Sequence, residues 1–108
     1  MVTVTLAREA REQLSELPRP IALRMAKLLT RLSQWPKVSG VKYLRGDLTG
    51  TCRLRTGDYR LQFHVLETKT AIKEKRSDQG NEVIAERETN DYVVVVEKIG
   101  HRDGFYED

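Results

Sequence analysis

The sequence predicts a single α+β domain, with an N-terminal strand and a helical hairpin packed on a mostly antiparallel, twisted sheet. Three observations predict this class. Apolar residues recur at helical spacing between residues 10 and 35, an alternating pattern with a two-residue turn occupies residues 51–63, and four consecutive valines stand at 93–96. Helical segments come before most of the strands and do not alternate with them, which favours segregated layers. A chain of 108 residues has room for one hydrophobic core.

The N-terminal third predicts one strand and two helices. Val2–Leu6 alternates between apolar and polar residues, as a short strand does. Apolar residues at positions 10, 14 and 17 then follow the i, i+4, i+7 spacing of a short amphipathic helix that stops at Pro18. Pro20 can open a second helix at its first turn, and Pro36 closes it. This second helix carries one continuous apolar stripe: Ile21, Met25, Leu28, Leu32 and Trp35.

From Val41 the pattern becomes that of strands. We expect a strand over Val41–Leu44, a loop over 45–50, and a hairpin over Thr51–Phe63 that turns at Gly57-Asp58. A two-residue turn fixes the register, so that Arg55 faces Arg60. The expected core face comprises Cys52, Leu54, Leu61, Phe63 and Val65, and the opposite face comprises Arg53, Arg55, Arg60, Gln62 and His64.

Residues 69–91 form a charged insert within the domain, which spans 1–108. They are dense in charge of both signs and have few sizeable apolar residues, so they cannot build a core of their own. A turn-like segment, 77–81, lies at the middle. We therefore expect a projecting hairpin or a mobile loop here.

The last strand ends in groups that can perform chemistry. Val93–Val96 is predicted to be buried on both faces at the centre of the sheet. After Gly100 come His101, Arg102 and Tyr106, at the rim of that sheet. Of the two histidines, His101 is the better candidate for proton transfer. His64, in mid-strand, is interpreted as a structural residue.

The arginine face of the hairpin allows two interpretations. Opposed arginines repel by about 0.2–1 kcal/mol, a cost that a purely structural sheet avoids. The structural interpretation is a solvated face whose arginines pair with acidic side chains from elsewhere. The functional interpretation is a site for anions, since the guanidinium fork matches phosphate oxygens and stays charged. If the Val93–Val96 strand lies beside this hairpin, Arg102 and Tyr106 emerge near the same face, and the result is a basic groove edged with aromatics that suits single-stranded nucleic acid.

Composition excludes several classes of function. One cysteine and two histidines without ligand spacing give no metal site, and no cofactor motif is present. The single cysteine suits a reducing cytosol. The sequence has no signal peptide, and no apolar stretch approaches the roughly 20 residues that a membrane span needs. We therefore expect a soluble cytoplasmic protein with no membrane partner.

Two segments, 44–61 and 99–106, resemble the RelE-like toxins of bacterial type II toxin–antitoxin systems, a superfamily that includes the ParE-like toxins. The order of strand, helical hairpin and antiparallel sheet is similar too. The resemblance implies a toxin that cleaves mRNA in the ribosomal decoding site without a metal. The ribose 2′-hydroxyl attacks its own phosphate and leaves a 2′,3′-cyclic phosphate. It also implies a cognate antitoxin, the ribosome and mRNA as partners.

The resemblance assigns roles to individual residues. Arg60 corresponds to the arginine that holds the phosphate, Arg102 to the one that stabilises the transition state, and Tyr106 to the tyrosine near the scissile base. Positions 53 and 55 are often lysine in the family, and Arg55 is a poor base because its pKa lies above 12. The expected catalytic residues are Arg55, Arg60, His101, Arg102 and Tyr106; the expected RNA-binding residues are Arg45, Arg53, Arg55 and Arg60.

Two other functions stay open at this point. One is a ParE-like protein that inhibits DNA gyrase by binding alone, although such proteins generally lack these catalytic side chains. The other is a non-toxic relative, either a decayed toxin or an RNA-binding module.

Overall fold

The computed structural model describes residues 1–104, without the side chains of Glu74, Arg76 and Asp78. It confirms the predicted α+β class with an N-terminal strand and two helices. The elements in order are β1 (Val2–Leu6), α1 (Arg8–Glu16), α2 (Arg19–Leu32), β2 (Lys42–Tyr43), the 3₁₀ turn η1 (Gly46–Leu48), β3 (Cys52–Thr56), β4 (Tyr59–Asp78), β5 (Asn81–His101) and the 3₁₀ turn η2 (Arg102–Gly104). No helix among the described residues is long and apolar enough to cross a membrane.

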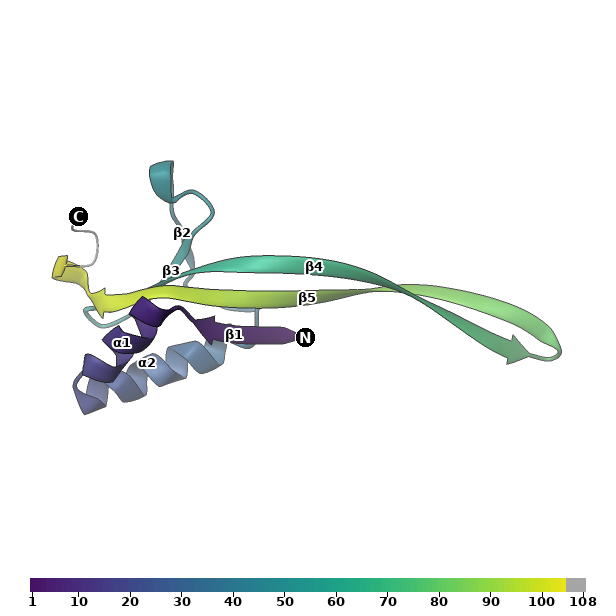
Figure 1. Cartoon of the computed structure of the whole chain (residues 1–108), viewed down its shortest axis with the longest axis horizontal. Helices are drawn as coiled ribbons and strands as arrows, with labels where there is room; N and C mark the ends of the chain where they lie inside the picture. Colours follow the sequence, from purple (N-terminus) through teal and green to yellow (C-terminus); the bar gives the residue numbers. More distant parts are fainter. Residues whose placement is uncertain (105–108) are drawn as a thin grey trace.

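The five strands form one sheet in the order β1-β5-β4-β3-β2 (Figure 1). Only β1 and β5 pair in parallel, with Val2 opposite Tyr92, and the other neighbours are antiparallel. The predicted strand at 41–44 is shorter than expected, because β2 pairs with β3 through two residues only.

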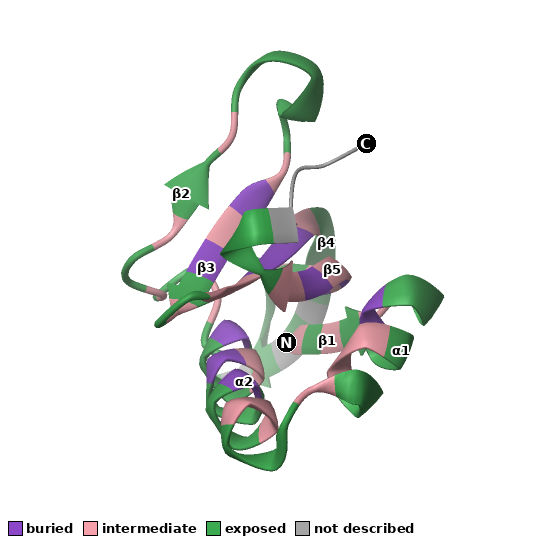
Figure 2. Cartoon of the chain, turned by 90° about the vertical axis from the view of Figure 1, so that its left-hand side faces the viewer, coloured by how far each residue is buried: buried purple, intermediate pink, exposed green. Residues whose placement is uncertain are grey.

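Both helices cover the same face of the sheet (Figure 2). The apolar stripe of α2 turns toward β3, and Trp35, just beyond the helix end, sets its ring edge-on to Phe63 at 5.6 Å between ring centroids. The buried core includes four of the five residues of the predicted core face of the hairpin. Its members are Ala10, Met25, Leu28, Leu32, Cys52, Leu54, Leu61, Phe63, Val94, Val96 and Ile99. Val65 packs against this core and is partly buried.

The valine run is buried on one face only, which corrects the prediction that both faces are covered. Val94 and Val96 are fully buried, whereas Val93 is 36% exposed and Val95 is half-buried. Side chains of a strand alternate between faces, and here the helices cover only one of them. The other face of the sheet, called the open face below, is the one that carries the arginines.

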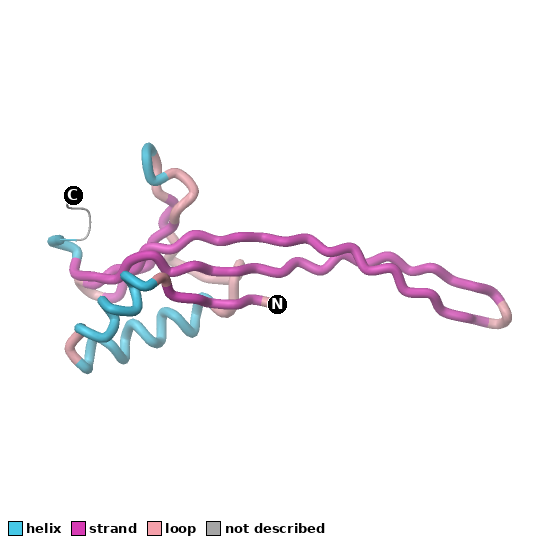
Figure 3. Tube along the Cα trace, viewed as in Figure 1, coloured by secondary structure: helices cyan, strands magenta, loops and turns pink. Residues whose placement is uncertain are grey.

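The insert is a projecting hairpin, one of the two forms expected for it. Beyond the other strands, β4 and β5 continue alone as a long two-stranded arm (Figure 3). The arm reverses at Gln79 and Gly80, whose φ angles of 53° and 79° are those of a type I′ turn. Exposed ion pairs link its strands, with 3.5 Å separating Lys73 Nζ from Glu86 Oε1. The arm gives the chain its longest dimension, 66 Å.

Candidate functional site

The hairpin of β3 and β4 has the predicted register, and this sets the arginines of the open face side by side. Arg55 lies directly opposite Arg60, and Arg53 lies opposite Gln62. Directly opposed Cβ atoms are about 5 Å apart. Three guanidinium groups therefore emerge from one face of one hairpin, as the sequence predicted.

A fourth cation, Lys42, joins them from the edge strand. It pairs with Arg53 across β2 and β3, and the two line a hollow of about 300 Å³ together with Gly40 and Arg55. Sequence reasoning missed Lys42, because a strand of two residues gives too little pattern to show which way it faces. Every charged group at this hollow is a hydrogen-bond donor, so the hollow suits an anion.

Arg60 carries a donor that nothing in the described structure satisfies. Its Nε is buried and has no hydrogen-bond partner among residues 1–104. On the adjacent strand Gly100 lies opposite Arg60, so β5 contributes no side chain at this point. Leaving a buried donor unpaired costs about 1–3 kcal/mol, and more for a charged group. A phosphate oxygen is a suitable acceptor for a guanidinium N–H, and a movement of the Arg60 side chain on binding would bring this donor to it.

Arg102 and Arg45 lie just beyond the ends of two strands of this sheet, β5 and β2. Arg102 opens η2 and is held at the hairpin turn, where its backbone N–H donates to the carbonyl oxygen of Asp58 at 2.8 Å. Its Nε lies 3.8 Å from Asp58 Oδ1 and 3.5 Å from Asp103 Oδ1. Arg45 is exposed in the loop between β2 and β3 and lines a shallow hollow along β2.

His101, one of the two predicted proton-transfer residues, is not brought to the open face. His101 lies opposite Tyr59, and their rings meet edge-on with centroids 5.2 Å apart. Tyr59 and Ile99 belong to the helix-covered side, so alternation along β5 turns His101 to that side as well. Its Nδ1 accepts a hydrogen bond from the backbone N–H of Asp103. Tyr106 lies outside the described residues.

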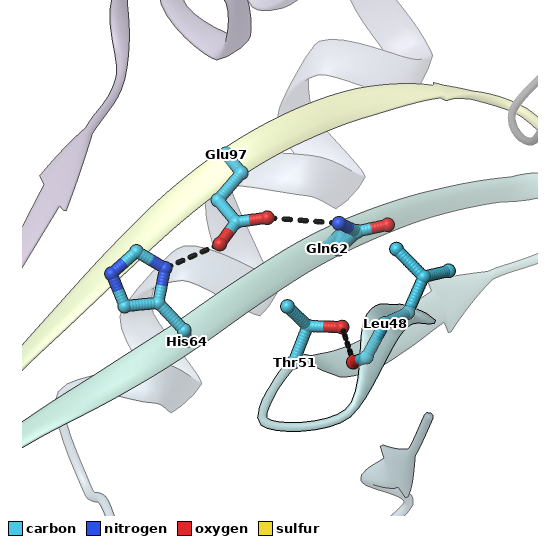
Figure 4. Close-up of polar contacts among 5 residues, drawn as sticks. All are labelled: Leu48, Thr51, Gln62, His64 and Glu97. Atoms are coloured by element: carbon cyan, nitrogen blue, oxygen red, sulfur yellow. Dashed lines mark hydrogen bonds and ion pairs between the residues drawn. The ribbon is translucent and has the colours of Figure 1, made fainter. Parts of the chain in front are cut away.

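A carboxylate on the open face was not predicted at all. Glu97 lies between Gln62 and His64 in the close-up view (Figure 4). Gln62 Nε2 donates to Glu97 Oε2 at 2.8 Å, and His64 Nδ1 contacts Glu97 Oε1. The side chains of His64 and Glu97 are only 33% and 30% exposed.

A β-bulge explains why Glu97 points this way. Phe63 pairs with Val96 and Gln62 pairs with Lys98, so Glu97 is the extra residue on β5. The sequence did hold a signal. The buried residues Val96 and Ile99 are three positions apart, whereas strict alternation would separate them by an even number.

Other chemistry finds little support in these residues. Burial raises the pKa of the Cys52 thiol, so this thiol stays protonated on the core face of the hairpin and is a poor nucleophile. Within the described part of the chain, no three His, Cys, Asp or Glu side chains gather as a metal site would require.

Comparison with known proteins identifies the fold. No family model and no curated protein sequence matches the chain. Among solved structures, a chain of the toxin–antitoxin complex RelBE2 from Mycobacterium tuberculosis is 27% identical, with a TM-score of 0.60, over 93% of this chain and 96% of that one. A chain of the archaeal RelE-RelB complex from Pyrococcus horikoshii OT3 is 21% identical, with a TM-score of 0.57, over 94% of both chains. The chain therefore has the RelE-like fold, and the resemblance seen in its sequence is confirmed at the level of structure.

Proposed function

We propose that this protein is the toxin of a type II toxin–antitoxin system and that it cleaves mRNA on the ribosome without a metal ion. Two observations support the proposal. Its similarity to a chain of a toxin–antitoxin complex extends over almost the whole length of both chains. Its open face carries a cluster of cations of the kind that binds an RNA phosphate: Lys42, Arg53, Arg55 and Arg60.

The chemistry assigned to this face is internal transfer at one phosphodiester. The ribose 2′-oxygen forms a bond to phosphorus, the bond from phosphorus to the 5′-oxygen breaks, and a 2′,3′-cyclic phosphate remains. Arginines cannot give up protons near neutral pH. Arg55, Arg60 and Arg102 are therefore proposed to bind the phosphate and to stabilise the charge that grows on it in the transition state. Arg45 and Arg53 are proposed to bind the flanking RNA.

Within this cluster, the observation that carries the proposal is the unsatisfied donor of Arg60. A folded protein satisfies nearly all of its buried polar groups. Here a buried N–H faces no acceptor, and a like charge, Arg55, stands opposite. Both features reduce stability, and both are accounted for if the partner of this face is a phosphate.

His101 and Tyr106 stay the sequence-based candidates for protonating the departing 5′-oxygen. His101 adjoins Arg102 at the rim of the sheet, on the helix-covered side. His101→Ala and Tyr106→Phe are each expected to slow single-turnover cleavage by about 10²-fold, the scale of one acid–base group. If both variants cleave within a few-fold of the parent rate, neither residue moves the proton.

We further propose that the partner of the toxin is a cognate antitoxin protein. A segment that combines acidic side chains with apolar anchors would complement a basic face. A small gene next to that of the toxin, if one is present, would be the candidate. Co-expression of its product should restore growth and yield a complex that survives size-exclusion chromatography. Growth inhibition that this product does not relieve would contradict its role as antitoxin.

Controlled expression in a bacterial host, followed by primer extension on cellular mRNAs, tests the activity. Cuts within translated frames are expected with the parent protein and should be absent with Arg60→Met. Intact mRNA together with stalled DNA replication would instead indicate a gyrase inhibitor. Intact mRNA with normal replication and growth would indicate a relative without toxic activity.

A further inference from the structure

We infer that His64, oriented by Glu97, is the general base that accepts the proton of the RNA 2′-hydroxyl. This inference rests on the proposed function, and it names the group that takes the proton. His64 belongs to the open face of β4, on which Arg60 and Gln62 also stand. The positions of this face that are proposed to bind phosphate include Arg53, Arg55 and Arg60, and an arginine cannot serve as a base near neutral pH.

The contacts of His64 set its tautomer. A carboxylate only accepts hydrogen bonds, so Nδ1 of His64 carries the hydrogen that it gives to Glu97 Oε1. In the neutral ring the lone pair is then on Nε2, which makes no hydrogen bond within the described residues. The nitrogen that can accept a proton is therefore the one that the protein leaves for a ligand.

Glu97 is held so that it can orient the ring. Gln62 Nε2 donates to Oε2 at 2.8 Å while His64 contacts Oε1, so both carboxylate oxygens have a partner (Figure 4). With both oxygens engaged, Glu97 is less suited to take the proton itself. It acts as a positioning residue, and its negative charge stabilises the imidazolium that forms when His64 is protonated.

The position of the pair fits a phosphate bound by the arginines. Residues that alternate on one face of a strand are about 6.6 Å apart, which places His64 two such steps from Arg60. Arg53 lies opposite Gln62, one step from His64. A phosphate held between Arg53 and Arg60 would lie beside Gln62, one step along β4 from His64, whereas the ring of His101 faces the other side of the sheet.

A solely structural pair is the alternative interpretation. An ion pair on a sheet surface contributes about 0–1 kcal/mol, so His64 and Glu97 could serve only to fasten β4 to β5. The two interpretations differ in chemistry. A base takes the 2′-hydroxyl proton onto Nε2 as the oxygen bonds to phosphorus and the 5′-oxygen departs, taking its own proton from a rim residue or from water. A fastening pair does nothing in that step.

The test is single-turnover cleavage of mRNA on programmed ribosomes. His64→Ala is expected to slow cleavage by about 10²-fold with unchanged ribosome binding, and added imidazole should restore part of the rate. Glu97→Gln should slow cleavage less than His64→Ala does. Adding His64→Ala to Glu97→Gln should slow cleavage further. Glu86→Gln on the arm makes the same substitution at an exposed carboxylate of the same strand, so it is the control and should leave the rate unchanged.

A substrate with sulfur in place of the bridging 5′-oxygen shows whether His64 acts as the base or as the acid. Its leaving group departs without protonation, so the defect of His64→Ala should persist if His64 is the base. Loss of the defect on this substrate would show that His64 is an acid and would overturn the assignment. Where His64→Ala does not fold, His64→Gln keeps a donor toward Glu97 and takes its place.

The outcomes separate this inference from the function on which it rests. If the parent protein cleaves and His64→Ala cleaves within a few-fold of it, the inference is wrong and the proposed function stands. If the parent protein itself leaves ribosome-bound mRNA intact, the proposed function fails, and the role of His64 fails with it.

Discussion

Replacing Arg60 by methionine should make the protein more stable and less active. Methionine keeps the unbranched stem of the side chain and removes the guanidinium. The change relieves the repulsion from Arg55 directly opposite, about 0.2–1 kcal/mol. It also removes a buried Nε–H that has no partner in the described residues. In the parent protein this unpaired donor lowers the free energy of unfolding by about 1–3 kcal/mol.

Some of this gain is offset, because Arg60 is half-buried and the shorter methionine side chain fills less of the space around it. We therefore expect a net increase of about 1 kcal/mol in the free energy of unfolding, or about 4 °C in Tm for a chain of this size. Cleavage should fall by about 10²-fold to 10³-fold, the usual effect of removing one donor to a transition-state oxyanion.

Urea unfolding measures the first quantity, with a raised midpoint and an unchanged slope, and single-turnover cleavage measures the second. Arg55→Met separates the two contributions, since it relieves the repulsion and leaves the Arg60 donor unpaired. Arg8→Met removes an exposed arginine paired with Glu12 on α1 and should change neither stability nor cleavage appreciably. A loss of more than about 1 kcal/mol in Arg60→Met would show that the arginine is structural and would refute this reasoning.

Three further predictions concern the packing around the site and the arm. Gln13→Leu should destabilise the fold by about 1–3 kcal/mol in urea unfolding, because Gln13 Oε1 accepts the backbone N–H of buried Ile99 at 2.7 Å; an unchanged midpoint would mean that water replaces this bond. Burial raises the pKa of Cys52, so its thiol should react with a thiol reagent only as fast as the chain unfolds; rapid labelling of the native protein would contradict this protection. For the same reason, the stability that the protonated thiol contributes should be lost as pH rises through its folded pKa. Deleting 73–78 and 81–86 retains the two-residue turn and the alternation of both strands, so far-UV circular dichroism and Tm should show a folded protein; an unfolded product would show that the arm packs on the core.

The hairpin was predictable because its signals are local. Gly57 and Asp58 permit a two-residue turn, and that turn alone fixes which residues face one another from Arg53 to Gln62. The apolar stripe of α2 was predictable for a similar reason, since its spacing depends on a single helix. Both predictions needed no knowledge of distant parts of the chain.

The features that sequence reasoning missed depend on contacts between distant segments. Whether Val93 is covered depends on where the helices pack, and nothing in the valine run itself encodes that. His64 appeared structural because its partner, Glu97, is 33 positions away and reaches it only through the bulge in β5. The length of the arm was hidden by its charge, because two-stranded ribbons exposed on both faces lack the apolar alternation that marks a strand.

The chemical nature of the cut end tests the central claim most directly. Ribosomes that carry a synthetic mRNA are incubated with the parent protein or with Arg60→Met. In a further reaction, the parent protein meets ribosomes that carry the same mRNA with a 2′-deoxyribose at the cleavage position. Mass spectrometry then identifies the 3′ end of the upstream fragment. We expect a 2′,3′-cyclic phosphate with the parent protein, much less of it with Arg60→Met, and no cut at the deoxyribose. A fragment that ends in a 3′-hydroxyl, or cleavage that persists at the deoxyribose, would contradict attack by the 2′-hydroxyl on the arginine face.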